Sequence, residues 1–233
     1  MDPDPVTLPE AVGALRAAAD ASRRPGMARV GIRVEHALGV RVPSIRAIAK
    51  RAGMDHDLAI ALWSTRIHEA RILATLVADP ARMTDELMDA WVVDIDSWDV
   101  GDFAADLFTR ARGRERAIRA WARREEPFVK RCAFAMIARR AVRDRAASDA
   151  AFTRYFATTR SGARDARNEV KKGVSWALRQ IGKRDATLYR ATLNEASAML
   201  EESERTGSRP MRWVARDVLR ELRLPEHVAR LGG

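Results

Sequence analysis

The sequence predicts an all-α protein in which helical hairpins stack into an α-solenoid. Apolar residues recur at spacings of three and four over segments of roughly 10–20 residues, as on one face of a helix. Glycine and proline fall mostly between these segments, and no run shows the alternation with turn signals that strands require. Successive helix pairs with a period of roughly 35–45 residues are typical of solenoid repeats.

The expected helices follow one another closely. Thr7, Thr84 and Ser148 precede helical patterns and suit N-cap positions, while Pro43 and Pro210 suit the first turn of a helix. From these starts and the apolar spacing, we expect helices over residues 8–21, 27–39, 43–52, 56–63, 66–78, 83–93, 98–110, 113–123, 127–143, 148–157, 163–183, 187–203 and 210–222.

Length and composition fit a folded, water-soluble protein. The 233 residues are 47% hydrophobic and 32% charged, which is typical of globular domains. We expect residues 1–6 to be flexible and residues 7–230 to form a single domain. The one cysteine, Cys132, excludes a disulfide within the chain.

We expect no metal site, no membrane span and a cytoplasmic location. His68 opens a string similar to a zinc-protease motif, but Ile72 stands where the second histidine would be. The apolar stretch over residues 132–138 is too short to cross a bilayer. The acidic first five residues lack the apolar segment of a signal peptide.

Charge is segregated along the chain. Residues 110–184 carry 22 basic and 7 acidic residues, whereas residues 54–109 carry 3 basic and 12 acidic residues. A strongly basic segment favours a polyanionic partner, most simply nucleic acid. Genome composition could explain why 37 of the 42 basic residues are arginine, but it does not explain the segregation.

A cationic stripe with a tryptophan marks the expected helix over residues 163–183. Lys172, Trp176, Arg179 and Lys183 follow one another at helical spacing, opposite an apolar face that includes Leu178. Cations for phosphates and a ring for a sugar or base are typical of nucleic-acid surfaces. Alternatively, a neighbouring helix covers the ring, or an arginine stacks on it.

A second tryptophan, Trp98, is expected to lie beside Asp102, away from the apolar face of its helix. A carboxylate beside an aromatic ring can stabilise a developing positive charge or position a water. The simpler alternative is an aspartate that favours the helix dipole, which is the role we expect for Asp99. The other tryptophans, Trp63, Trp91, Trp121 and Trp213, are expected in the core.

Arg131 is expected inside a buried helix, where an arginine must be paired with an acidic group or bind a ligand anion. Its neighbour Cys132 is interpreted as a small buried hydrophobic residue. Asp55, His56 and Asp57 are interpreted as a solvated helix start.

Taken together, these segments resemble the AlkD-like DNA alkylation repair family, bacterial DNA glycosylases built from HEAT-like repeats. The segment from Trp98 to Asp102 is similar to the Trp-Asp-x-x-Asp segment of the family, and Arg131 to Ala133 to its Arg-x-Ala segment. Residues 171–179 resemble its Lys-Lys-x-x-x-Trp-Ala-Leu-Arg segment, and residues 212–217 the ending of one branch. The similarity runs over roughly residues 30–222.

The resemblance implies a right-handed solenoid with a concave basic face, acting as a monomer without a cofactor. It implies hydrolytic excision of cationic N3- or N7-alkylated purines, such as 3-methyladenine and 7-methylguanine, from duplex DNA. Asp102 would be the catalytic carboxylate, Trp98 and Trp176 would bracket the sugar, and Arg131 would hold a phosphate. Further DNA contacts would come from Lys171, Lys172, Arg179 and Lys183.

Two readings of the function therefore remain. No lysine is placed to act as a Schiff-base nucleophile, so a monofunctional glycosylase without strand-nicking activity is expected. The alternative is a non-catalytic solenoid that binds DNA or an acidic protein partner. Both predict salt-sensitive DNA binding, but only the glycosylase predicts a released base.

Overall fold

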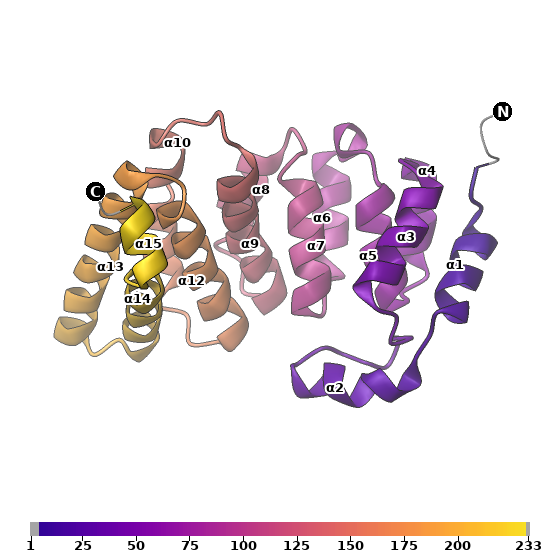
Figure 1. Cartoon of the computed structure of the whole chain (residues 1–233), viewed down its shortest axis with the longest axis horizontal. Coiled ribbons are helices and arrows are strands. Elements are labelled where there is room, and N and C mark those ends of the chain that lie inside the picture. The colour runs from indigo at the N-terminus through magenta and orange to yellow at the C-terminus, as the bar shows by residue number, and fades with distance from the viewer. Residues whose placement is uncertain (1–4, 232–233) are drawn as a thin grey trace. The chain divides into compact units, whose positions relative to one another are not determined.

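The computed structural model of the chain describes residues 5–231, whose regular elements are all helices, with no strand among them (Figure 1). This confirms the predicted all-α fold. The chain divides into two compact units, the first ending at Gly113 and the second beginning at Arg114. No helix within the described range is long and apolar enough to span a membrane.

Unit 1 is built around α5, which packs against α3, α4 and α7. The stacked rings of Trp63 and Trp91, with centroids 4.2 Å apart, join α4 to α6 in its core. Its elements are α1 (Leu8–Ala17), the 3-10 helix η1 (Ala21–Arg23), α2 (Arg24–Arg29), α3 (Val42–Ala52), α4 (His56–Ser64), α5 (His68–Val77), the 3-10 helix η2 (Pro80–Arg82), α6 (Asp85–Val93) and α7 (Trp98–Phe108).

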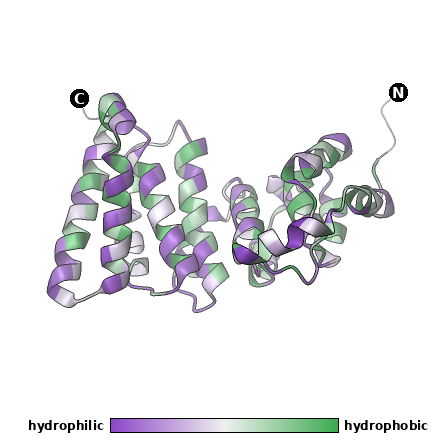
Figure 2. Ribbon diagram, turned by 60° about the horizontal axis from the view of Figure 1, so that its bottom comes forward, coloured by the Kyte–Doolittle hydropathy of each residue, from purple (hydrophilic) through white to green (hydrophobic). Residues whose placement is uncertain are grey.

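Unit 2 is built around α12, which packs against α9, α13 and α14. Figure 2 shows hydrophobic and hydrophilic residues interleaved along its long helices, as expected for helices with one buried face. Its elements are α8 (Arg114–Trp121), α9 (Pro127–Arg143), α10 (Ala150–Thr153), α11 (Phe156–Gly162), α12 (Asn168–Gly182), α13 (Ala186–Thr206), α14 (Arg209–Leu222) and α15 (Pro225–Leu231).

The helix predicted over residues 27–39 is wrong. The chain forms η1 and α2 and then runs as a loop to Arg41. Gly39 adopts a φ of +82°, which favours glycine, and a Cβ there would overlap the backbone oxygen of Asp20. The buried carboxylate of Glu69 accepts the backbone N–H groups of Leu38, Gly39 and Val40 at 2.8, 2.7 and 3.1 Å. The loop thereby satisfies its backbone without forming a helix.

Other predicted helices differ from the structure in their ends or number, and α1 ends at Ala17, four residues earlier than predicted. The segment predicted over residues 148–157 splits into α10 and α11, and α12 begins at Asn168, five residues later than predicted. Asp165 holds the preceding turn, because its carboxylate accepts the backbone N–H of Arg167 at 3.0 Å. The helix α15, which begins at Pro225, was not predicted. Residues 1–4 of the predicted flexible N-terminus lie outside the described residues.

Candidate functional site

In unit 1, α7 begins at Trp98 and places this ring and Asp102 away from the buried face of the helix. Val100, Ala104 and Leu107 are fully buried, whereas Trp98 is 37% exposed and Asp102 is partly buried. The indole N–H of Trp98 donates to the backbone oxygen of Val30 at 3.0 Å. The ring is therefore held in place by the loop that follows α2. The two-sided character predicted for this helix is confirmed.

Asp99, between these residues, has a partner that was not predicted. Its Oδ2 lies 2.9 Å from Nε2 of His68, and its Oδ1 accepts the backbone N–H of Val100 at 2.9 Å. Burial alone would lower the pKa of His68, but the hydrogen bond to Asp99 and the nearby acidic charges raise it. Burial likewise opposes ionisation of Asp99, but His68 outweighs it and lowers the pKa of Asp99. The pair joins α5 to α7 directly behind Trp98.

A mostly apolar pocket of about 560 Å³ lies beside this pair. Trp98 and Phe103 of α7 contribute to its wall, together with Val30 and Ile32 of the loop that follows α2. The pocket thus borders the exposed tryptophan without containing Asp102. His56, at the start of α4, is buried rather than solvated, which corrects its predicted exposure. Its neighbour Asp55 caps α4 by accepting the backbone N–H of Leu58 at 2.9 Å.

In unit 2, Arg131 is an interior charge, as predicted. It lies in α9 with 7% of its surface exposed, and its Nη1 donates to the backbone oxygen of Glu169 at 3.2 Å. Gly173 of α12 lies close to this side chain, since a Cβ there would be in ordinary van der Waals contact with Cγ of Arg131 at 3.4 Å. The next residue, Cys132, is fully buried, in agreement with its interpretation as a core residue. Arg131 is therefore fixed by the packing of α9 against α12.

The stripe on α12 has the predicted exposure. Lys172 is exposed and Trp176, Arg179 and Lys183 are partly exposed, whereas Leu178 on the opposite face is fully buried. The alternative in which an arginine stacks on the ring is also realised, because the guanidinium of Arg139 lies 5.1 Å from the ring centroid of Trp176. The ring is thus part of a cationic surface and not of the core.

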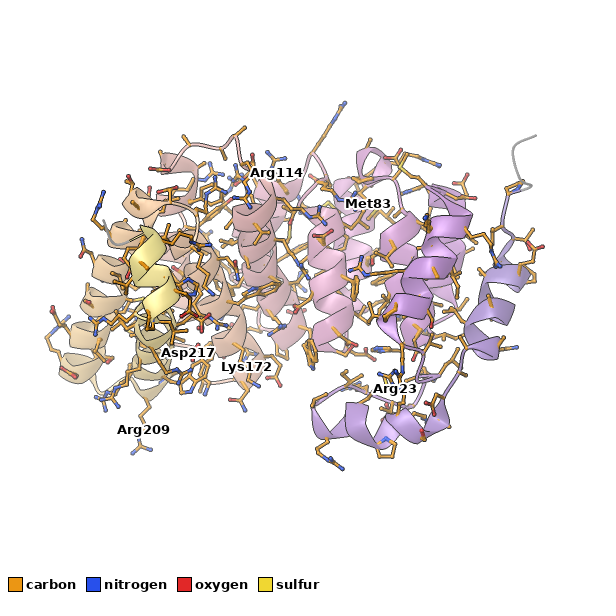
Figure 3. All side chains as sticks on the ribbon, in the orientation of Figure 1. Arg23, Met83, Arg114, Lys172, Arg209 and Asp217 are labelled. Carbon is orange, nitrogen blue, oxygen red and sulfur yellow. The ribbon has the colours of Figure 1, made fainter. Side chains whose placement is uncertain are left out.

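Two cations of the stripe, Arg179 and Lys183, lie close to carboxylates of α14. Nζ of Lys183 lies 2.5 Å from Oε1 of Glu221, and Arg179 lies 3.8 Å from Asp217 and 3.7 Å from Glu221. The hydrogen bond from Lys183, together with the nearby charges, lowers the pKa of Glu221 although burial opposes this. Lys172 is therefore the cation of the stripe with the greatest exposure, and Figure 3 shows it at one end of unit 2.

The prediction that all four remaining tryptophans lie in the core is wrong for Trp213. Trp63, Trp91 and Trp121 are buried, but Trp213 of α14 is 40% exposed, and Nζ of Lys171 lies 5.2 Å from its ring centroid. The spacing of the apolar residues of α14 could have predicted this exposure. The buried face of α14 consists of Met211, Val214, Val218 and Leu222, and Trp213 does not lie on it.

Comparisons with known proteins agree with this architecture. One similar solved structure belongs to a new family of proteins related to the HEAT-like repeat DNA glycosylases with affinity for branched DNA structures. It has a TM-score of 0.73 and 16% sequence identity, over 82% of each chain. This likeness shows a HEAT-like repeat fold. No curated protein matches the chain. The pattern of the DNA alkylation repair enzyme family matches residues 12–222, and the chain therefore belongs to that family.

Proposed function

We propose that the protein is a DNA glycosylase that hydrolyses the N-glycosidic bond of cationic N3- or N7-alkylated purines in duplex DNA. Membership of the repair family gives the chain a role in DNA repair. The observation that carries the finer proposal is the arrangement on α7, where a fixed, partly exposed Trp98 lies one helical turn before Asp102. An aromatic ring and a carboxylate on one side of a helix suit a positively charged sugar.

Breaking the N-glycosidic bond of such a base does not require the protein to protonate the leaving group. An alkylated purine is already cationic, so the bond between C1′ and N9 breaks with its electron pair moving to the base, which leaves neutral. Positive charge then develops on the deoxyribose, where the Asp102 carboxylate stabilises it. Water bonds to C1′ and loses a proton to the carboxylate or to solvent, which leaves an abasic site. Trp98 adds a cation–π contact and shields the sugar from bulk water.

Unit 2 supplies the contacts to the DNA backbone in this proposal. Lys171, Lys172, Arg179 and Lys183 bind phosphates, Trp176 contacts a sugar, and Arg131 binds a phosphate. The exposed position of Lys172 and the cationic surroundings of Trp176 support these roles. The protein acts as a monomer and requires no cofactor.

The test is release of 7-methylguanine and 3-methyladenine from methylated duplex DNA, measured by chromatography under single-turnover conditions. Asp102→Asn should lower the rate of release about a hundredfold or more, because the amide offers no negative charge to the sugar. Its affinity for DNA should stay within about twofold. Asp106→Asn, the same substitution one turn further along α7, is the matched control and should keep its activity.

An Asp102→Asn protein that folds normally and releases bases at the wild-type rate would refute the catalytic role. The alternative is a non-catalytic repeat protein that binds DNA, and the affinity of the structural neighbour for branched DNA favours it. In that case, neither the wild-type protein nor any variant would release a base, although DNA binding would be retained.

A further inference from the structure

One face of α14 carries four arginines and a tryptophan. Their spacing of three and four places them along one side of the helix, and they line a groove of about 340 Å³. We call this surface the α14 patch; it consists of Arg209, Arg212, Trp213, Arg216 and Arg220. Asp217, which also lines the groove, is the one acidic residue in its wall. The patch is therefore strongly cationic.

The tryptophan of the patch stands apart from the tryptophans of the core. Trp213 is exposed over 40% of its surface even with Lys171 against its ring. The indole N–H groups of Trp63 and Trp98 donate to Asp94 and to Val30, but no acceptor for that of Trp213 is found among residues 5–231. A partly exposed ring therefore lies among the cations of the patch.

The patch is rigidly mounted. Asp217 is buried, and its carboxylate accepts the hydroxyl hydrogen of Ser175 at 2.5 Å, which ties α14 to α12. The same carboxylate pairs with Arg220 of the patch. The opposite face of α14 is fully buried, at Met211 and Leu222 among other residues. A ring on such a helix is preorganised, so a ligand that stacks on it loses little entropy to ordering.

We infer that the α14 patch binds unpaired nucleotides, with a base stacked on Trp213 and the flanking phosphates bound by the arginines. Inside an intact duplex, neighbouring base pairs cover both faces of every base. A protein ring can therefore stack only on a base that is unpaired or at an end. Aromatic rings among cations are the usual means of binding single strands. This inference rests on the DNA binding in the proposed function.

The α14 patch can distinguish unpaired from paired DNA, whereas the cationic stripe on α12 cannot. Phosphate contacts from Lys172 and its neighbours serve any DNA, paired or unpaired. Stacking on Trp213 instead increases the affinity only for DNA in which a base face is accessible, as at a fork, a gap or a displaced strand. Figure 3 shows Arg209 of the patch reaching away from the end of α14. There it can bind a strand that leaves the duplex.

The test compares two DNAs in fluorescence anisotropy titrations: a blunt duplex whose terminal base pairs are covered by stacked end caps, and a fork with the same duplex and two single-stranded arms. Trp213→Ala should weaken binding to the fork about tenfold and binding to the blunt duplex less than twofold. Trp213→Phe, which keeps a ring, should retain most of the preference. Arg216→Gln should weaken both complexes, whereas Arg119→Gln, at an exposed arginine of α8, should weaken neither.

Equal affinity of wild type and Trp213→Ala for the fork, or an equal loss on both DNAs, would overturn the inference. Circular dichroism and thermal melting of both Trp213 variants show whether the fold is retained. Release of 7-methylguanine, measured on the same proteins, tests the proposed function separately. Proteins that release no base but still prefer the fork through Trp213 would refute the glycosylase and support the patch.

Discussion

The loop that holds Trp98 in place depends on one buried side chain, Glu69. Its carboxylate receives three backbone N–H groups, from Leu38, Gly39 and Val40, and only 1% of the residue is exposed. Glu69→Gln keeps the size of the side chain but replaces one acceptor oxygen by an NH₂ group. If the remaining oxygen keeps Gly39 and Val40, the NH₂ group faces the N–H of Leu38, and that hydrogen bond is lost.

The expected cost follows from this geometry. A hydrogen bond to a charged group contributes about 1.5–3 kcal/mol, and the two remaining bonds lose their charge assistance. We therefore expect Glu69→Gln to lower the free energy of unfolding of unit 1 by about 2–4 kcal/mol. Hydrogen exchange of the amides of Leu38, Gly39 and Val40 should accelerate. Because Val30 in the same loop accepts the Trp98 indole N–H, base release should also slow.

Glu35→Gln is the matched control, since Glu35 lies exposed in the same loop. It changes the net charge by the same amount and should leave both stability and exchange unchanged. Denaturant unfolding and amide exchange of the two variants can be compared directly. Equal stability of the two, with unchanged protection at the three amides, would show that the carboxylate does not hold the loop.

Two further predictions concern charge. Because the pKa of His68 is raised in the folded protein, its charged form stabilises the fold. This contribution is complete below the unfolded pKa of about 6.5 and is lost as pH rises through the folded pKa. Because the pKa of Asp99 is lowered, its ionised form stabilises the fold above about pH 4. Wild-type stability in urea should therefore fall, relative to Asp99→Asn, as pH rises above about 6.5, and parallel curves would contradict the pair. Lys172→Ala should reduce the salt slope of DNA binding by about one unit, and Lys183→Ala by less, because Glu221 already neutralises Lys183.

The sequence predicted which faces of α7 and α12 are buried. On α12, the period of the apolar residues places Val174, Leu178 and Ile181 inside and Lys172 and Trp176 outside, and the structure agrees. This succeeds because burial of a stripe on a helix depends only on local spacing. The roles assigned to Asp102, Arg131 and Trp176 in catalysis come from resemblance and remain predictions.

Contacts between repeats could not be predicted in the same way. In unit 1, Leu38 meets Glu69, Trp63 meets Asp94 and His68 meets Asp99, each pair separated by 31 residues. In unit 2, Ser175 meets Asp217 and Arg160 meets Glu202 at a separation of 42 residues. Without a repeat alignment, nothing in the local pattern connects such residues.

The failed helix over residues 27–39 has a different cause. Its apolar spacing was helical, but Gly31 and Gly39 adopt positive φ, and the acceptor that stabilises the loop is Glu69, about 30 residues further along the chain. Local propensity was overridden by a distant carboxylate. The prediction for Trp213 is wrong because the burial that is usual for large aromatic residues does not apply to a residue on the solvent side of its helix.

The net positive charge of the second half of the chain overstates the number of basic residues that can bind DNA. Many of its arginines have structural partners. The bonds from Arg140 to Glu115 and from Arg160 to Glu195 lie inside unit 2. Hydrogen bonds from Arg167, with help from Lys130, hold the pKa of Asp165 well below its usual range although burial opposes this.

Such pairs fix helices to one another and are not available to a polyanion, so the charge that attracts DNA is smaller than the count of basic residues. Some of the other basic residues differ from these in that they lie beside a tryptophan. Lys172 shares its helix face with Trp176, and Arg212 and Arg216 flank Trp213. The surfaces proposed to bind DNA are therefore those where a basic residue lies beside a tryptophan that is at least partly exposed, as at Trp176 and Trp213 of unit 2.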